Sequence, residues 1–429
     1  MNDHPSSPSP SRLQRPPIGV CLILAAAVIS PAFAAISGAD LHLGGIASDI
    51  QFGGFASQGY LKSSANDYLG NTSEGTFDFR EYAVNTSYAA GKFRIGAQAF
   101  GQKLGDYGDD KIKLDWGMVD YQAAQWFGVR AGRVKMPRGL YNEALDVDSV
   151  RPFVLLPQSV YDNRLRDFNA SFDGAMLYGN VSIGKAGSID YRVFDGKKPM
   201  SVPSGANDYF NNDGAFRNIN IKMDSVRGGT LFWNTPADGL RIGYSYNAFK
   251  DLYSERYASN LVGKGMPEAM LYFSKATPTY DRHLVSVEYI KGNWVLAAEA
   301  GREKAYYEIR LTLIGSHLVF YDSKSEYFYV SAARRINRWL ELGAYYSHSF
   351  DRQTLIGPLL NPDMLKPDLK QGDFAVSAKF DVNDHLLVKI EGHYMDGAGK
   401  IFDTLAQPQP FAKRDTSWSM LAVKTTYSF

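Results

Sequence analysis

The sequence has almost no cysteine and no long apolar run, and its charges nearly cancel. Cys21 is the one cysteine among 429 residues, which excludes disulfides and thiolate metal sites as sources of stability. With 46 Lys and Arg against 45 Asp and Glu, the balance argues against a nucleic-acid partner. No close spacing of His, Asp and Glu suggests a metal site, and no phosphate-cradling glycine loop is present, so we expect no cofactor.

The N-terminus has the pattern of an export signal. A polar start that contains Arg12 and Arg15 is followed by an apolar run over 18–29 and by an A-x-A pattern at 32–34. This arrangement is typical of a secretory signal peptide with cleavage after Ala34. A membrane anchor helix is the weaker interpretation, because the apolar run is too short to span a bilayer. We therefore expect residues 1–34 to be a signal peptide and residues 35–429 to be the mature, exported chain.

Aromatic residues and glycine are abundant, and much of the chain alternates with period two. The 27 Tyr, 25 Phe and 40 Gly suit aromatic girdles and twisted strands. A soluble sandwich would alternate in the same way, so the alternation alone does not decide the fold. The clearest examples place Phe93, Ile95, Ala97 and Ala99 opposite Arg94, Gly96 and Gln98; Leu240, Ile242, Tyr244 and Tyr246 opposite Arg241, Gly243, Ser245 and Asn247; and Ile112, Leu114, Trp116 and Met118 opposite Lys111, Lys113, Asp115 and Gly117.

The connections between these segments decide the fold, because they alternate between short and long. Short turns are expected at 90–91, 126–127, 185–187, 236–239, 291–293, 336–338 and 382–384, and long loops at 65–74, 105–110, 137–166, 197–224, 251–279, 308–324, 352–370 and 399–414. Transmembrane antiparallel β-barrels of bacterial outer membranes have this pattern. The sequence therefore predicts an all-β barrel of about sixteen strands. Eighteen is the alternative count, because 309–321 could form a hairpin, although its arms look too short to cross a membrane.

The loop predicted at 137–166 differs from the others. Pro137, Pro152 and Pro157 exclude a regular strand, while Val154, Leu155 and other apolar residues argue against disorder. These side chains need cover. We expect the segment to fold into the lumen of the barrel as a constriction loop.

Two further features resemble bacterial outer-membrane porins. The chain ends on Phe429, and the last strand of such porins typically ends in phenylalanine. Residues 128–143, GVRAGRVKMPRGLYNE, resemble a motif of the phosphate-selective and related substrate-selective porins, which Lys135, Pro137, Gly139, Leu140 and Glu143 match. Arg138 departs from the motif, since an aromatic residue often stands there. The resemblance implies a loop that constricts the channel after the fifth strand, and a homotrimer. The lysine ladder of a phosphate channel is not found, so phosphate selectivity is not carried over.

The polar faces of barrel strands line the lumen, and this places the candidate site residues. At the constriction we expect Arg133, Lys135, Arg138, Glu143, Asp146, Asp148, Arg151, Arg164 and Arg166; on the lumen wall we expect Arg94, Arg192, Arg241, Glu299, Lys379, Lys389 and Glu391. Opposed charges around a narrow passage would sort solutes by charge, but the loop is too evenly balanced to give an ion preference. In the alternative interpretation the loop arginines pair with carboxylates, Arg164 with Asp162 and Arg166 with Asp167, and hold the loop against the wall.

The predicted function is passive diffusion of small hydrophilic or charged solutes through a channel in the outer membrane, where the chain contacts lipid. The chain is not expected to be an enzyme. The alternatives are a lipolytic or proteolytic barrel enzyme and a non-conducting structural or adhesin barrel. Acyl transfer would need a nucleophile beside a base, and His348-Ser349 is the one pair we would test. The remaining histidines are expected to be ordinary loop or rim residues.

Overall fold

The computed structural model describes residues 50–200, 206, 217–257, 263, 265, 271–311, 317–355, 369–401 and 413–429. The side chains of 217, 311, 317–321 and 353–355 are not part of this description. The predicted signal peptide, 1–34, lies outside the described residues. No helix in the described ranges is both long enough and apolar enough to cross a membrane.

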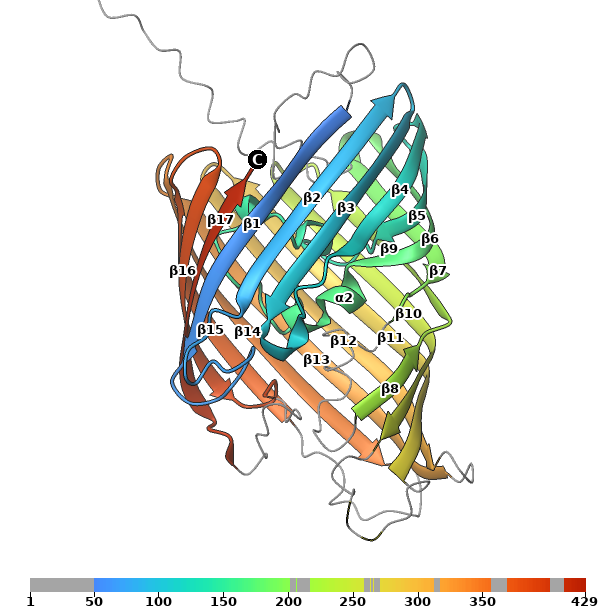
Figure 1. Cartoon of the computed structure of the whole chain (residues 1–429). Helices are drawn as coiled ribbons and strands as arrows, with labels where there is room; N and C mark the ends of the chain where they lie inside the picture. Colours follow the sequence, from blue (N-terminus) through green and yellow to red (C-terminus); the bar gives the residue numbers. More distant parts are fainter. Residues whose placement is uncertain are drawn as a thin grey trace, which may run out of the picture. The chain divides into compact units, whose positions relative to one another are not determined.

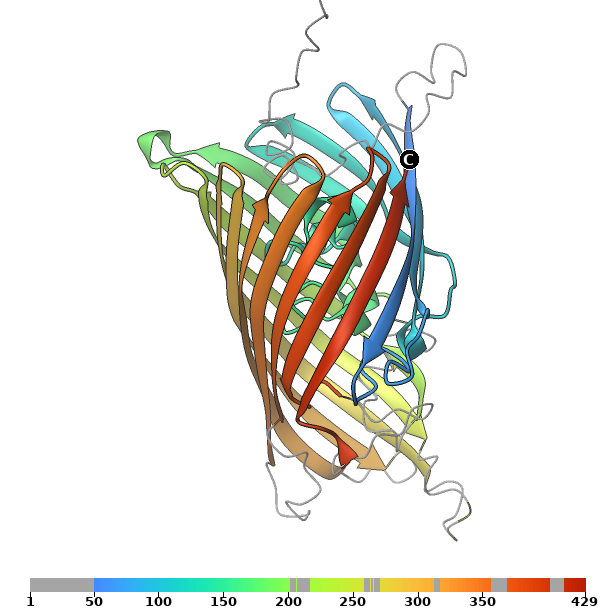
Figure 2. The ribbon, with the colours of Figure 1, turned by 90° about the vertical axis from the view of Figure 1, so that its left-hand side faces the viewer.

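The described residues form one antiparallel sheet that closes on itself between its first and last strands (Figures 1 and 2). Two of its strands, β8 and β9, both pair with β10 and are separated only by residues 223–224, so they share one position and the barrel has sixteen. The predicted fold class is confirmed. The strands are β1 (Ile50–Ser63), β2 (Phe79–Ala90), β3 (Phe93–Leu104), β4 (Lys113–Ala124), β5 (Phe127–Lys135), β6 (Ser171–Ser182), β7 (Ser188–Lys197), β8 (Arg217–Lys222), β9 (Ser225–Asn234), β10 (Leu240–Tyr257), β11 (Tyr272–Lys291), β12 (Trp294–Leu311), β13 (His317–Arg335), β14 (Leu340–Leu355), β15 (Leu369–Asp381), β16 (Leu386–Gly397) and β17 (Ser417–Ser428).

The C-terminal phenylalanine takes part in the closure of the barrel. Phe429 and Gly54 exchange backbone hydrogen bonds of 3.0 Å in both directions, next to the β1–β17 ladder. A Cβ atom on Gly54 would lie 2.7 Å from the Phe429 ring and 2.5 Å from the carbonyl oxygen of Ala83. Glycine therefore lets the last residue pack against β1. A closed sheet has no open edge. In lipid, an open edge would cost several kcal/mol for each unpaired backbone group.

All seven predicted short turns are confirmed within a residue or two, and they lie at the barrel end where β1 begins and β17 finishes (Figure 1). Exposed tryptophans border these turns, as expected of a girdle at a membrane interface. They are Trp126 (61% exposed), Trp233 (40%), Trp294 (44%) and Trp339 (48%).

The outer surface of the strands is apolar. Phe93 and Ile95 on β3 are 56% and 55% exposed, while Gln98 on the alternate face is buried. On β10, Tyr244 is exposed, whereas Arg241 and Ser245 are buried. Exposed apolar side chains over buried polar ones are the reverse of a soluble protein, and they confirm the predicted alternation in these two segments.

Four predicted long loops are shorter than expected because the strands continue into them. At 352–370 the change is small, since β14 runs to Leu355 and β15 begins at Leu369. β12 runs to Leu311 and β13 begins at His317, so the predicted loop at 308–324 is mostly strand; its arms lengthen two strands and add none, and the count of eighteen is wrong. The loop at 251–279 likewise shortens to 258–271, and the loop at 197–224 contains β8. As a result, β10 to β14 have 16 to 20 residues, whereas β2 to β7 have 9 to 12. One wall is taller than the other (Figure 2).

The predicted common face of Ile112, Leu114, Trp116 and Met118 is wrong. Gln98 pairs with Trp116 but Ala99 pairs with Leu114, so Asp115 is an extra residue at a β-bulge. Leu114 is 50% exposed, while Asp115 and Trp116 are both buried. Strict alternation would also place the Asp115 carboxylate inside the barrel. The effect of the bulge is that the Trp116 side chain lies inside as well.

Candidate functional site in the barrel lumen

The segment between β5 and β6, residues 136–170, folds inside the barrel, and we call it the inward loop (Figures 1 and 2). It contains three 3₁₀ turns, η3 (Asn142–Ala144), η4 (Asp148–Val150) and η5 (Asn163–Leu165), and one short helix, α2 (Arg166–Asn169). Its position agrees with the inward fold that the prolines and apolar residues predict. Three groups of contacts hold it to the wall.

The motif residues build the first contact, with the tall wall. Gly139 has φ of +56°, and its N–H donates to Ser245 Oγ at 2.9 Å on β10. The N–H of Leu140 donates to Glu299 Oε1 at 3.0 Å and to the Tyr161 hydroxyl oxygen at 2.9 Å. A Cβ on residue 139 would lie 2.5 Å from both of those oxygens. Only glycine fits this conformation in this space, so the motif glycine serves the docking of the loop.

Glu299 on β12 is a loop anchor and is 2% exposed. Besides Leu140, its carboxylate accepts hydrogen bonds from Ser286 Oγ at 2.5 Å, from the Tyr329 hydroxyl at 2.9 Å and from the Tyr161 hydroxyl. Two of these donors belong to the wall and two to the loop. The carboxylate is therefore saturated by protein donors.

Arg138, the residue that departs from the motif, is 2% exposed. Its guanidinium donates to the carbonyl oxygen of Val160 at 2.6 Å and to the Tyr327 hydroxyl at 3.2 Å, and lies 3.6 Å from Glu303. It lies about equally far from two aromatic rings, Tyr161 at 6.0 Å and Tyr327 at 5.9 Å. The arginine ties two parts of the loop to β12 and β13.

Asp148 is the centre of the second contact, with the strands near the closure. It accepts from Thr426 Oγ1 at 2.6 Å and lies 2.8 Å from Lys424 and 3.3 Å from Lys389. Arg151 is further away, at 3.6 Å. Burial alone would raise the pKa of Asp148, but Lys389 and Lys424 hold it below its ordinary value. The carboxylate stays charged because cations surround it.

The backbone of the same part of the loop is held as well. Glu391 on β16 accepts from the N–H groups of Val154 and Leu155 at 3.0 and 2.9 Å. Lys389 donates to the carbonyl oxygen of Phe153 at 3.0 Å, and Lys379 donates to that of Ser149 at 2.5 Å. These wall residues, predicted from their strand positions, face inward and bind the loop.

The apolar residues 153–156 are buried against the wall, with exposures of 4% or less. Phe153 packs edge-on against Tyr345 with ring centroids 5.1 Å apart. Val154 and Leu155 join a cluster of fourteen buried side chains from both ends of the chain, and Leu156 joins a second cluster around Tyr161. Such burial explains why this loop carries so many apolar residues.

Arg166 makes the third contact, with the short wall. Its guanidinium lies 2.9 Å from Asp115 and 2.7 Å from Asp146, and its Cζ lies 3.3 Å from the Phe100 ring centroid. Lys135 is 3.2 Å from Asp146 on the other side. Arg166 therefore pairs with Asp146 and with Asp115 at the bulge. The expected pair with the adjacent Asp167 is wrong, because Asp167 lies 3.7 Å from Lys113 instead.

Arg164 pairs with the neighbour that the sequence suggested. It donates to Asp162 at 2.8 and 2.7 Å and to the carbonyl oxygen of Lys400, and it is 1% exposed. The rings of Tyr68 and Tyr107 lie 5.1 and 5.7 Å from its Cζ. The arginine joins the inward loop to loops of both chain ends.

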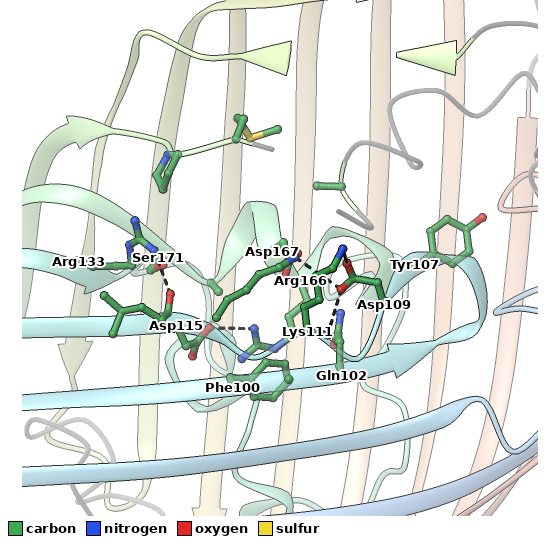
Figure 3. A pocket seen from close by; sticks show the side chains of 18 of the residues that line it. Phe100, Gln102, Tyr107, Asp109, Lys111, Asp115, Arg133, Arg166, Asp167 and Ser171 are labelled. Carbon is green, nitrogen blue, oxygen red and sulfur yellow. Dashed lines mark hydrogen bonds and ion pairs between the residues drawn. The ribbon is translucent and has the colours of Figure 1, made fainter. Parts of the chain in front are cut away.

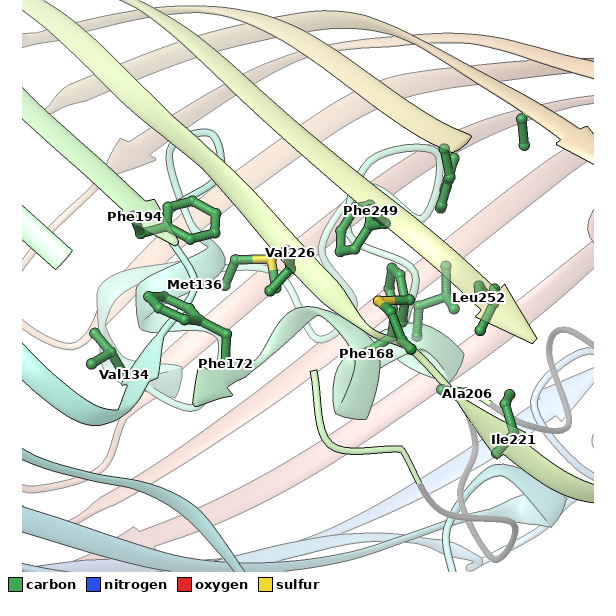
Figure 4. Close-up of a cluster of buried hydrophobic side chains, with 14 of the residues drawn as sticks. Val134, Met136, Phe168, Phe172, Phe194, Ala206, Ile221, Val226, Phe249 and Leu252 are labelled. Atoms are coloured by element: carbon green, nitrogen blue, oxygen red, sulfur yellow. The ribbon is translucent and has the colours of Figure 1, made fainter. Parts of the chain in front are cut away.

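The inward loop returns to the wall through Phe168, which is fully buried (Figure 4). Its ring lies 4.7 Å from Phe249 and 6.3 Å from Tyr280. Phe172 and Phe194 continue the cluster along β6 and β7, with ring centroids 4.5 Å apart. This apolar packing fixes where β6 begins.

Three more predicted wall residues face the lumen. Arg94 is half-buried and lies across from Asp120 in the β3–β4 ladder. Arg192 lies 3.4 Å from Glu143 of the inward loop. Arg241 lies 3.7 Å from Glu288, with its Cζ 4.0 Å from the Phe232 ring centroid.

The assignment of β5 needs a correction. Arg130 and Val134 are buried on the inner face, so Arg133 lies on the outer face with the exposed Ala131, and its expected position at the constriction is wrong. Neighbours in a strand point to opposite faces. Arg133 donates to Asp173 at 2.7 and 3.0 Å. Arg130, which was not among the predicted site residues, lies 3.3 Å from Asp120. Every second residue of a strand faces the same side, so counting back from the apolar Val134 would have placed Arg130 on the inner face.

A cavity of about 340 Å³ lies where β4 and β5 part, beside the end of the inward loop (Figure 3). Phe100, Asp115, Arg166 and Asp167 line it from the lumen side. Lys198, which follows β7, is 4% exposed there and donates to the carbonyl oxygen of Ser171. Burial lowers the pKa of Lys198 to about 8.

One histidine is placed differently from expectation. His393 is 4% exposed, with Nδ1 3.0 Å from Asp373 and Nε2 3.0 Å from Glu391, so describing it as an ordinary rim residue is wrong. His348 stacks on Phe328 on the outer face, whereas Ser349 is buried on the inner face. Within the described ranges, no group of three or more His, Cys, Asp or Glu residues could hold a metal ion.

No protein-family model matches the chain, and no curated protein matches it either. Solved structures do match, over 89% of this chain. OmpF of Salmonella typhi, in complex with daunomycin, has a TM-score of 0.54 at 13% identity, with 97% of that chain covered. An anion-selective porin from Comamonas acidovorans has a TM-score of 0.51 at 13% identity, with 99% covered.

The fold is porin-like. OmpT, an outer-membrane protein of Vibrio cholerae, adds a third match, with a TM-score of 0.53 at 11% identity and 97% of that chain covered. Identities this low show the fold alone. A porin-like barrel with an apolar outer surface belongs in the bacterial outer membrane.

Proposed function

We propose that this porin-like barrel is a passive diffusion channel for small hydrophilic or charged solutes. The observation that carries the proposal is the inward loop, which crosses the lumen of a closed barrel and is bound to β10 and β12, to β15 to β17, and to β3 and β4. A loop fixed in this way narrows a lumen to a constant cross-section. That arrangement suits size selection among solutes.

The proposal divides the predicted constriction residues by their contacts. Arg138, Asp146, Asp148, Arg164 and Arg166 are anchors, because each has charged or hydrogen-bonded protein partners at close range and is almost fully buried. They fix the position of the loop and have little direct contact with solutes.

Glu143 is better placed to meet a solute, whereas Arg151 is 7% exposed and lies 3.6 Å from Asp148. Glu143 is about a quarter exposed. Arg151 has two guanidinium nitrogens, Nε and Nη1, that make no hydrogen bond to the described residues. It lines a narrow gap between the loop and β2, β3 and β17, together with Gln102 and Lys424.

The enzyme alternative lacks support at the pair that the sequence offered. His348 and Ser349 lie on opposite faces of β14, as neighbours in a strand do, so the imidazole cannot activate that hydroxyl. Only a conductance measurement distinguishes a non-conducting structural barrel from a channel. We also propose, from the resemblance to porins, that three copies associate.

Solute flux into liposomes tests the proposal. Vesicles that contain the refolded barrel should swell in isotonic solutions of small sugars and amino acids, with rates that fall as solute size rises, and should show no lipase or protease activity. Swelling rates equal to those of protein-free vesicles, with the barrel shown to be inserted, would refute the channel.

A further inference from the structure

The outer face of the tall wall carries a row of cations just beyond its apolar band. On β12, β13 and β14, residues directly opposite one another form rows across the strands. The row Ala300, Phe328 and His348 is the last apolar one. The next contains Arg302, Glu326 and Phe350, and the one after it contains Lys304, Lys324 and Arg352, all three exposed. Lys370 on β15, also exposed, pairs with Phe350 beside them.

The positions of these cations are unfavourable for a sheet. Like charges directly opposite on neighbouring strands destabilise a sheet. Within the described residues, no carboxylate lies within ion-pair distance of Lys304, Lys324 or Lys370. Asp281 is opposite Lys304 in the β11–β12 ladder, but its carboxylate accepts a hydrogen bond from the Tyr246 hydroxyl. An anion from outside the chain would balance these three lysines.

The height of the row matches the headgroups of a lipid leaflet. Trp294 belongs to the tryptophan girdle beside the short turns, and Lys304 follows it by ten residues on the same face. At about 3.3 Å per residue and a strand tilt of about 40°, this separation is roughly 25 Å along the membrane normal, the height of the apolar band of such barrels. The row therefore lies at the opposite interface, on the side of the long loops.

A hollow of about 640 Å³ lies on the outer face directly beside this row. It exists because Ala300 is small while its neighbours on β11 and β13, Val285 and Phe328, are large. Its outward lining residues are Tyr244, His283, Val285, Ala300, Phe328 and His348, and Arg302 and Glu326 close the end nearest the cations. An apolar hollow next to a cationic row fits an amphiphile.

We propose that Lys304, Lys324 and Arg352 bind the phosphate groups of an anionic lipid in the leaflet on the loop side, and that the hollow beside them takes part of its acyl chain. The site lies outside the lumen, so it is independent of the channel. Charge complementarity selects the headgroup, because basic side chains near an anionic lipid surface are attracted to it. The apolar hollow distinguishes a lipid from free phosphate.

Native mass spectrometry of the delipidated, full-length mature barrel tests the site, with a bisphosphorylated glucosamine lipid as probe and phosphatidylcholine as the zwitterionic reference. The variant Lys304→Gln/Lys324→Gln/Arg352→Gln should lose at least tenfold in affinity for the anionic lipid. The matched control Lys92→Gln/Lys185→Gln/Lys291→Gln removes three exposed cations near the short turns and should bind like the wild type. Equal losses in both variants would overturn the proposal.

Two further arms separate the parts of the site. Ala300→Phe fills the hollow and should weaken lipid binding several-fold without removing a charge. Inorganic phosphate at millimolar concentration should not displace the lipid; displacement would mean a phosphate site only, and would contradict the role of the hollow. Heat-modifiable migration on denaturing gels confirms that each variant is folded, and unchanged single-channel conductance would show that the lipid site and the channel are separate.

Discussion

Gly139 shows how a single residue fixes the inward loop. Its φ of +56° already disfavours a side chain, and a Cβ there would collide with Glu299 and Tyr161 at 2.5 Å. Gly292, in a short turn, has a similar φ of +59° with nothing within 4 Å. Alanine variants at these two glycines therefore separate the cost of backbone strain from the cost of a steric collision.

We predict that Gly139→Ala loosens the loop. Backbone strain alone costs roughly 1–2 kcal/mol, and the collision adds to it, so the variant should unfold at a lower temperature than Gly292→Ala and should show noisier single-channel currents. Equal thermal stability and quiet currents in both variants would mean that the loop does not depend on this contact.

Lys198 is a buried group beside the inward loop that titrates near neutral pH. Burial lowers its pKa to about 8, and the nearby carboxylates of Asp167 and Asp115 offset only part of this effect. Because the cationic form is the one disfavoured, the lysine is charged below pH 8 and neutral above it. The lining of the neighbouring cavity therefore becomes more negative as the pH rises.

The reversal potential under a salt gradient should accordingly shift toward cation preference between pH 7 and pH 9, with its midpoint near pH 8. Lys198→Met should remove most of this dependence and resemble the wild type at high pH. A pH dependence of the same size in Lys198→Met would assign the titration to another group.

At the scale of elements, the inward loop is held by buried charges. Asp148 joins the loop to β16 and β17 through Lys389 and Lys424. Removing one partner of a buried ion pair typically costs about 3–5 kcal/mol, because the other charge is left uncompensated, whereas a partly exposed pair is worth about 1 kcal/mol or less. The Arg133–Asp173 pair on the outer face, with Asp173 43% exposed, is of the second kind.

Asp148→Asn should therefore lower thermal stability far more than Asp173→Asn, and it should raise the mean conductance or its variance as the middle of the loop is released. Melting followed by circular dichroism and planar-bilayer recording measure the two effects. Similar behaviour of the two variants would show that Asp148 is not an anchor.

Acid should break the ion pairs of Asp146 and Asp148 only well below ordinary carboxyl titration. Burial works against the charge on Asp146, but Arg166 and Lys135 hold the pKa of Asp146 below its usual range, and the cations around Asp148 do the same there. A depressed native pKa stabilises the fold at every pH above the unfolded value of about 3.9 and loses that effect as the pH falls through the native one. The difference in current noise between Asp148→Asn and the wild type should stay constant from pH 7 to about pH 4; a loss of this difference between pH 6 and pH 5 would contradict this assignment.

The elements were largely predictable from the sequence, and the contacts inside the barrel were not. Turn residues and alternation located the seven short turns, because both depend on local geometry. The bulge at Asp115 inserts one residue and leaves no local trace, so the sequence misplaced Trp116 and missed the pair of Arg166 with Asp115. The inward-loop partners of Glu299, Lys389 and Glu391 lie more than 130 residues away along the chain, and nothing in one sequence reveals such pairs.

For the whole molecule, the account rests on a path for solutes through the lumen beside the inward loop. Residues 35–429 contain no cysteine, so one introduced thiol can be modified without background. Glu143→Cys places the thiol on the loop, where the native side chain is partly exposed. Asp238→Cys places it in an exposed short turn, outside the lumen, as the matched control.

The most direct measurement is the single-channel current of these two variants in a planar bilayer before and after a bulky, water-soluble thiol reagent. The account predicts stable conductance steps for both, a stepwise drop in current on modification of Glu143→Cys, and no change for Asp238→Cys. Inserted barrels without conductance steps, or a current that ignores modification of Glu143→Cys, would contradict a channel constricted by the inward loop.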